Sequence, residues 1–224
     1  MLTGLLRWVP LLLGGFVSNI LVSLMAMALG TLLGLGLGLG QVSLSPVLRV
    51  GARGLTQFFR NAPWLVVLFF CVFAVPFDLR LGGLDLPLPA WVKATVGLGL
   101  AVMGSMSEIV RGGVVSVPAS QWESAESLAF SRTQTLWMVI LPQTVKRMLP
   151  PWMNLYAVLL MATPLVSIVG IQDVMALASG ALSADQRTGL LLPMYGMLLL
   201  WFFIVAWPID LATRRLERRF SAGY

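Results

Sequence analysis

The stretch EIVRGGVVSVPASQWESAESLA, residues 108–129, followed by Ile140-Leu-Pro at 140–142, is a polar island in an otherwise apolar chain. Hydrophobic residues make up 58% of the 224 residues, and charged residues make up 11%. Soluble proteins carry roughly 25% charged residues. The mean hydropathy is +0.89. This composition indicates an all-α integral membrane protein, in which the island is the part that contacts another protein.

Apolar runs separated by polar breaks predict five transmembrane helices. A helix needs about 20 mainly apolar residues to cross a hydrocarbon core of about 30 Å. We expect one transmembrane domain over residues 1–224, with a cytoplasmic loop at about 111–150. The five spans are expected at residues 16–40, 64–76 with its flanks, 88–106, 152–171 and 190–209.

Basic residues predict the orientation of the chain. If the chain crosses five times, one side carries most of the arginines, and the opposite segments hold most of the aspartates. Because cytoplasmic loops are enriched in Lys and Arg, we expect the N-terminus outside and the C-terminus in the cytoplasm. The net charge of +6 is then explained by topology and by anionic lipid, and no nucleic acid partner is expected. The basic side holds Arg49, Arg53, Arg60, Arg111, Arg132, Lys146, Arg147, Arg214, Arg215, Arg218 and Arg219.

The polar island predicts two short helices with a sharp joint near Ala129 and Phe130. Ser120-Gln-Trp-Glu and Ser131-Arg-Thr-Gln each fit a capping box, in which the serine accepts a hydrogen bond from the backbone N–H three residues later. Trp122, Ala125 and Ala129 share one helix face. That face either docks in a groove on a partner or packs against the chain's own membrane domain.

Two features inside the spans predict how the helices pack. Gly30, Gly34 and Gly38 recur every four residues, which favours close approach of a second helix, although glycine is common in membrane helices. Pro164 removes a backbone donor and frees the carbonyl of Leu160. We expect a kink there, with Thr163 or Ser167 bonding the freed group.

These motifs together resemble one family. Glu123-Ser-Ala, Ala129 where glycine is usual, and Ile140-Leu-Pro match the cytoplasmic EAA motif of permease subunits of ABC importers. The segments at 60–63, 108–113, 116–118, 121–123 and 165–170 look like the polar amino acid subfamily. The resemblance covers about residues 15–219.

The resemblance implies a type I importer permease with five helices in a bacterial cytoplasmic (inner) membrane. It implies pairing with a second permease, either the same chain or a sister chain. Two copies of an ATP-binding subunit and an extracytoplasmic solute-binding protein are the other implied partners. The short helix would be the coupling helix that fits a cleft on the ATPase, and the alanine at its joint implies a joint without a positive φ angle. The coupling residues would be Ser120, Trp122, Glu123, Ser124, Ala125, Leu128 and Ala129.

The translocation path is expected to be sparsely polar. Met161-Ala-Thr-Pro stands where the family often has Lys-Asp-Thr-Ser, so direct ionic contact with a substrate is not expected in this subunit. Asn154 and Thr163 either line the path or make interhelical hydrogen bonds. Glu108 either acts in gating or forms a structural ion pair with Arg111. The path candidates are Ser105, Glu108, Asn154 and Thr163.

Rival functions are disfavoured by missing residues. The chain has no histidine, which excludes a Ser-His protease pair and histidine-ligated zinc, and no cofactor is expected. Neither Lys93 nor Lys146 follows a phosphate-binding glycine loop, so we expect a transport subunit without its own ATPase site. A channel or a secondary transporter remains the alternative, although no ionisable residue lies clearly at mid-membrane.

Overall fold

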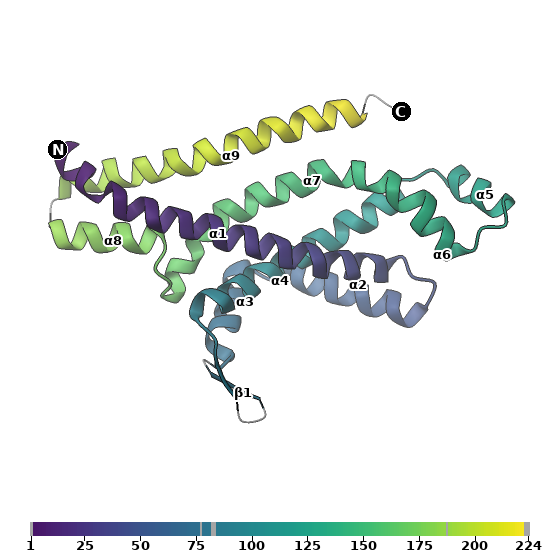
Figure 1. Cartoon of the computed structure of the whole chain (residues 1–224), viewed down its shortest axis with the longest axis horizontal. Helices are drawn as coiled ribbons and strands as arrows, with labels where there is room; N and C mark the ends of the chain where they lie inside the picture. Colours follow the sequence, from purple (N-terminus) through teal and green to yellow (C-terminus); the bar gives the residue numbers. More distant parts are fainter. Residues whose placement is uncertain (1, 77, 82–83, 187, 222–224) are drawn as a thin grey trace.

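The computed structural model describes residues 2–76, 78–81, 84–186 and 188–221. Four of its helices are long and apolar enough to cross a membrane, and a bent helix pair brings the count to as many as five. Five spans were predicted. In Figure 1 the N-terminus lies at the left end of the elongated molecule, and the last helix runs from that end toward the right. The long helices are α1 (Leu2–Gln41), α4 (Ala90–Val115), α7 (Leu141–Ala162) and α9 (Leu191–Ser221).

The second span is a bent pair of helices rather than one rod. α2 (Pro46–Asn61) meets α3 (Trp64–Phe69) and its π-helical continuation η1 (Phe70–Ala74) at an angle of 101°. The bend falls at Ala62 and Pro63, which are both extended. Proline disfavours helical geometry at the residue before it, so α2 ends there. An antiparallel hairpin of β1 (Asp78–Leu81) and β2 (Leu84–Pro87), with Asp78 opposite Pro87, leads into α4.

The segment predicted as a cytoplasmic loop, at about 111–150, is largely helical in the structure. α4 continues to Val115, and α5 (Ala119–Ser127) follows. The next span already starts at Arg132. It is built from α6 (Arg132–Gln134), the π-helical η2 (Thr135–Ile140), α7 and the 3₁₀-helical η3 (Thr163–Val169). Two helices were not predicted: α2, and α8 (Val174–Asp185), which is followed by η4 (Thr188–Leu190).

The closest helix contact joins α1 to α4 through the three glycines predicted to allow it. A Cβ atom built on Gly30 would lie 2.4 Å from Val102, one on Gly34 would lie 2.6 Å from Met106, and one on Gly38 would lie 2.5 Å from Val110. Real Cβ atoms do not approach neighbours this closely. The glycine face is therefore a packing face, as predicted, and it holds α1 and α4 in backbone contact.

Gly34→Ala is expected to lower the free energy of unfolding by about 1–3 kcal/mol, the usual cost of overpacking. The new methyl group would meet the Cβ of Met106 at 2.6 Å, which a rotamer change cannot relieve. Gly36→Ala is the matched control, because nothing lies within 4 Å of its Cβ position. Thermal unfolding of both variants in one detergent measures the difference. Equal midpoints would contradict the close packing of α1 on α4.

At Pro164, where a kink was predicted, the structure shows a change of helix type. α7 ends at Ala162, and residues 163–169 continue as the 3₁₀ helix η3, ending at Gly170 with φ 84°. Thr163 Oγ1 donates to the freed carbonyl of Leu160 at 2.7 Å. Ser167 Oγ instead donates to Pro164 O at 2.7 Å. Of the two predicted partners, Thr163 is therefore the one that satisfies the carbonyl.

Candidate functional site

Helix α5 begins two residues earlier than the capping box at Ser120 predicted, so the first capping box is wrong. Its N-cap is Pro118, with no side-chain cap, and the helix starts at Ala119. The backbone N–H of Gln121 donates to Pro118 O at 3.0 Å. Proline has φ set near the helical value, so it can begin a helix without a polar cap. Ser120 is thereby placed inside the first turn as an exposed residue.

The joint after α5 does require a left-handed residue, contrary to expectation. Ala129 has a φ of 60°. Its N–H donates to Glu126 O at 2.8 Å, and the N–H of Phe130 donates to Ala125 O at 3.1 Å. This pair of bonds is a Schellman motif, which places the left-handed residue just past the helix end, where glycine is favoured. The sharp joint at 129–130 is confirmed.

Ala129→Gly is expected to raise the free energy of unfolding by about 1 kcal/mol, because glycine adopts a positive φ without the Cβ clash. Ala119→Gly is the matched control, since Ala119 is also exposed in α5 but lies within the helix. The control is expected to lower stability by up to about 1 kcal/mol. Thermal unfolding of the two variants in the same detergent checks the opposite signs, and a loss of stability in both would contradict the assigned backbone.

The second capping box is present as predicted. Ser131 Oγ accepts from the N–H of Gln134 at 3.3 Å, and Gln134 Oε1 accepts from the N–H of Ser131 at 2.8 Å. This box starts α6 directly after Phe130, which follows the left-handed Ala129. The turn between α5 and α6 is therefore determined on both sides by hydrogen bonds, and the loop is ordered.

The two faces of α5 have different surroundings. Ala125 is 3% exposed, and Trp122 packs against the small cluster of Val114, Val117 and Ile140. The guanidinium of Arg132 lies 3.9 Å from the centre of the Trp122 ring. Within the chain, this face packs against the chain's own helices, which is the second of the two predicted alternatives. The predicted coupling residues on the outer surface are Ser120, Glu123, Ser124, Leu128 and Ala129, with Leu128 72% exposed.

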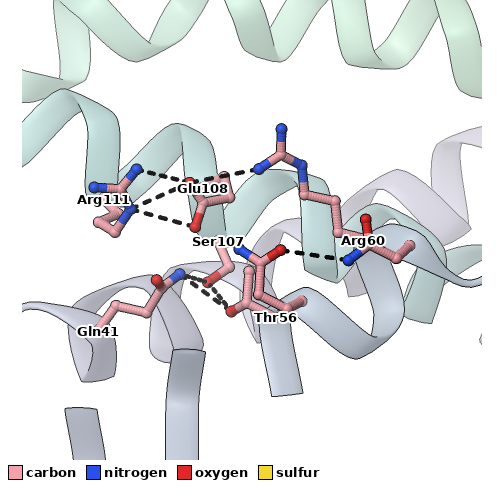
Figure 2. A network of polar contacts seen from close by, with 8 residues as sticks. Gln41, Thr56, Arg60, Ser107, Glu108 and Arg111 are labelled. Atoms are coloured by element: carbon pink, nitrogen blue, oxygen red, sulfur yellow. Dashed lines mark hydrogen bonds and ion pairs between the residues drawn. The ribbon is translucent and has the colours of Figure 1, made fainter. Parts of the chain in front are cut away.

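Glu108 forms the predicted ion pair with Arg111 near the C-terminal end of α4 (Figure 2). Arg111 Nη2 lies 2.9 Å from Glu108 Oε2, and Arg111 Nε donates to the same oxygen at 3.1 Å. Arg60 Nη1, from α2, approaches that oxygen to 3.8 Å. The carboxylate therefore links α4 to the bent second span. A gating role for Glu108 remains a prediction.

A buried polar triad lies beside this pair and was not predicted. Gln41 Nε2 donates to Ser107 Oγ at 2.7 Å and to Thr56 Oγ1 at 3.1 Å, and the two hydroxyls lie 2.9 Å apart (Figure 2). The three residues come from α1, α4 and α2, and each is at most 2% exposed. Membrane helices use such hydrogen bonds to hold helices together. The only sequence signal was polarity within apolar surroundings.

The path candidates within the membrane are in different environments. Thr163 is fully buried and accepts from Asn19 Nδ2 at 3.1 Å, so it makes the interhelical contact and does not face an open path. Asn154 is exposed on α7. It shares a stripe with Pro151, Val158 and Met161, which are also exposed. Ser105 is half-buried on α4.

A second buried cluster, which joins α1 to the start of α8, was also not predicted. Asn19 Nδ2 donates to Asp173 Oδ2 at 3.1 Å, and Asn19 Oδ1 accepts from the N–H of Val174 at 3.1 Å. Asp173 Oδ1 caps α8 by accepting from Ala176 N at 2.9 Å. Burial raises the pKa of the Asp173 carboxyl, while the bonds from Ala176 and Asn19 act in the opposite direction. An Asp directly before an apolar run was the signal that could have revealed the start of α8.

Lys93, near the start of α4, is buried and donates hydrogen bonds to backbone carbonyls. Its ammonium donates to Val72 O at 3.0 Å and to Val75 O at 2.7 Å, where η1 ends. Cations stabilise the carbonyl end of a helix. Over the part of the chain that the structure describes, His, Cys, Asp and Glu form no group of three that could hold a metal ion.

A family model and individual relatives point to the same class of protein. Residues 26–221 match the family model described as binding-protein-dependent transport system inner membrane component. The chain is 33% identical over 208 residues to a probable amino-acid ABC transporter permease protein, y4tF, of Sinorhizobium fredii, covering 93% of this chain and 86% of the relative. It is 29% identical over 205 residues to the probable glutamine ABC transporter permease protein GlnP of Bacillus subtilis, covering 92% and 91%.

Solved structures share the fold. A crystal structure of an amino acid ABC transporter with histidines superposes with a TM-score of 0.82 at 24% identity, covering 96% of each chain. An inward-facing structure of the MetNI methionine ABC transporter gives a TM-score of 0.72 at 13% identity, covering 94% of this chain and 98% of that one. At these identities the likeness concerns the arrangement of the helices.

Proposed function

Because the chain belongs to the family of binding-protein-dependent transport system inner membrane components, we propose that it is the membrane-spanning subunit of an ATP-driven amino acid importer. It is a multi-pass protein of the inner membrane, and its substrate is an amino acid or a close derivative. A solute-binding protein delivers that substrate on the outer side. The observation that carries the proposal is α5, an ordered helix whose inner face is anchored to the chain and whose outer face is open to a partner.

The proposed role of α5 is to transmit motion from an ATPase to the spans. Glu123, Ser124 and Leu128 are exposed and form the contact surface, together with Ser120 and Ala129 at its ends. Trp122 and Ala125 face inward and fix α5 to the helices that follow it. Closure of two ATPase subunits on ATP would then displace α5, and with it α4 and α7. This converts nucleotide binding into a change between outward-open and inward-open states.

The orientation that this role requires agrees with the distribution of charge. α5 must lie in the cytoplasm, because ATP is there. Arg49, Arg111 and Arg132 line a single cavity next to α5, so the basic residues gather on the same side as the helix. By the positive-inside rule this end is cytoplasmic, which leaves the N-terminus outside.

The proposed path follows the exposed stripe of α7, where Asn154 is the polar group among Pro151, Val158 and Met161. Ser105 on α4 adds a hydroxyl, and Glu108 lies at the cytoplasmic end beside a cavity of about 480 Å³. No charged group occurs on this stripe between residues 151 and 161. The subunit therefore offers hydrogen bonds rather than ion pairs to a passing solute, and Thr163 is excluded because it is buried.

A second permease is needed to close the path, because the α7 stripe is open on one side. A sister chain with charged groups at this level would supply the ionic contacts that Met161 and Ala162 cannot make. A second copy of this chain would form a path of uncharged groups. Robust transport by a complex of two copies of this chain with two ATPase subunits would count against the heteromeric arrangement.

The test is isolation of the complex from its own membranes in mild detergent, identification of its subunits by mass spectrometry, and reconstitution in vesicles. ATP-dependent uptake of a labelled amino acid, requiring the binding protein, is the expected result. A labelled sugar is the control solute. Isolation of this chain without an ATPase, under conditions that preserve related complexes, would favour a channel. Uptake of sugars alone would refute the amino acid assignment.

A further inference from the structure

A cavity of about 290 Å³ lies behind α5, where the ends of α1, α2 and α4 meet. Its polar lining is almost entirely basic. Two arginines come from successive turns of α2, one from α4 and one from α6. The lining residues that matter are Gln41, Arg49, Arg53, Arg111, Trp122 and Arg132.

The charge of this arginine cavity is only partly neutralised. Glu108 pairs with Arg111, and Arg60 approaches the same carboxylate from outside the cavity. The salt bridges of the described residues leave Arg49, Arg53 and Arg132 without a carboxylate partner. Like charges one helical turn apart, such as Arg49 and Arg53, destabilise a helix. Three guanidinium groups without a carboxylate partner, beside the paired Arg111, surround one cavity and therefore favour a bound anion.

The arrangement of these groups suits a phosphate. Guanidinium groups bind phosphate oxygens through paired N–H donors, and a ligand contacted from several helices can engage more than one fork. Arg132 is already immobilised by stacking on the Trp122 ring at 3.9 Å. Its side chain therefore loses little freedom when an anion binds. A carboxylate offers fewer oxygens than a phosphate to several guanidinium groups placed around it.

We propose that the arginine cavity is a binding site for a phosphate group, carried either by an anionic phospholipid of the adjoining leaflet or by a soluble phosphate compound. A bound phosphate would join α2, α4 and α6 to the Trp122 side of α5. It would thereby stiffen the attachment of α5 to the spans. This inference depends only on the cavity and its charges, and it would hold if the chain had a different transport activity.

The experiment uses the purified full chain, delipidated in a neutral detergent. Native mass spectrometry counts bound phosphatidylglycerol molecules, with phosphatidylcholine as the zwitterionic control. Titration calorimetry measures the binding of inorganic phosphate. The test variant is Arg49→Gln with Arg53→Gln. The matched control is Arg215→Gln with Arg218→Gln, which removes the same charge from exposed positions of α9. Arg132→Gln is a second, independent variant from another wall of the cavity.

Selective binding of phosphatidylglycerol, weakened about tenfold or more in the test variant and unchanged in the α9 control, supports the site with a lipid as its source. Binding of inorganic phosphate that is weakened to the same extent in the test variant identifies a soluble phosphate compound as the source. Arg132→Gln is expected to weaken binding in the same assay. If neither phosphatidylglycerol nor inorganic phosphate binds, the proposal is overturned. Equal loss in the cavity and α9 variants also overturns it, because attraction would then come from surface charge alone.

Discussion

Glu123→Lys is expected to abolish ATP-driven uptake while the chain remains folded and inserted in the membrane. Glu123 is exposed on the outer face of α5 and makes no ion pair within the chain among the described residues. Reversing a charge at a docked interface costs about 2–5 kcal/mol, which corresponds to at least a thirtyfold loss. The measurement is uptake and ATP hydrolysis by the reconstituted complex, together with the amount of ATPase that co-purifies.

Arg215→Glu is the matched control for this prediction. It reverses a charge of the same size at an exposed position of α9, outside α5, and Arg215 is not among the residues that line the cavity beside Glu108. Leu128→Asp tests the same surface without a lysine, because Leu128 is 72% exposed. Wild-type assembly and uptake in both α5 variants would show that this helix takes no part in coupling.

Ala125→Arg acts differently, because Ala125 is 3% exposed and faces the chain itself. An arginine there would displace α5 from its own anchorage before any partner is involved. Lower stability of the isolated chain therefore separates this variant from Glu123→Lys, which is expected to unfold at the wild-type temperature.

Asn19→Leu is expected to lower the free energy of unfolding by about 3–5 kcal/mol, the usual result of removing one partner from a buried charged group. Asn19 is 1% exposed and bonds to Asp173, Thr163 and the N–H of Val174. Leucine makes none of these bonds, so Asp173 Oδ2 and the backbone N–H of Val174 lose the hydrogen bonds that Asn19 gives them inside the protein. Thermal or denaturant unfolding in detergent measures the loss.

Ser18→Leu is the control, because Ser18 is adjacent in the same helix and is exposed. A substitution there is expected to change the free energy of unfolding by no more than about 0.5 kcal/mol. Similar free energies of unfolding for the two variants would mean that the cluster joining α1 to α8 contributes nothing to stability.

Much of the membrane architecture could be predicted from local signals. Apolar length located the spans, because the hydrocarbon core sets a minimum helix length. The spacing of Gly30, Gly34 and Gly38 predicted the α1–α4 contact, since helix periodicity places every fourth residue on one face. Pro164 and the Ser131 box act on their own neighbours, so the end of the regular α-helix near Pro164 and the start of α6 could also be predicted from sequence.

The remaining features depend on contacts between distant residues. α2 looked like a basic loop because its polar side faces α4 and the arginine cavity rather than a uniform core. The positive φ of Ala129 arises where the chain turns from α5 to α6. An alanine gives no sequence signal for a positive φ, because alanine is not a residue that favours it. Whether Trp122 and Ala125 faced a partner or their own domain could not be decided from periodicity, since both surfaces select small and apolar residues.

The length of α1 has a consequence for the surrounding bilayer. Its 40 residues extend about 60 Å at 1.5 Å per residue, twice the thickness of a hydrocarbon core of about 30 Å. Even at a tilt of about 40°, the upper end of the observed range, the helix rises about 46 Å, beyond the headgroups on both sides. Its N-terminal end is bonded to α8, where Trp8 Nε1 donates to Asp185 Oδ2 at 3.3 Å. The glycine face holds α4 against α1, so in a thinner membrane the two helices tilt together. Because α5 follows α4 in the chain, that tilt changes the position of α5 relative to the membrane.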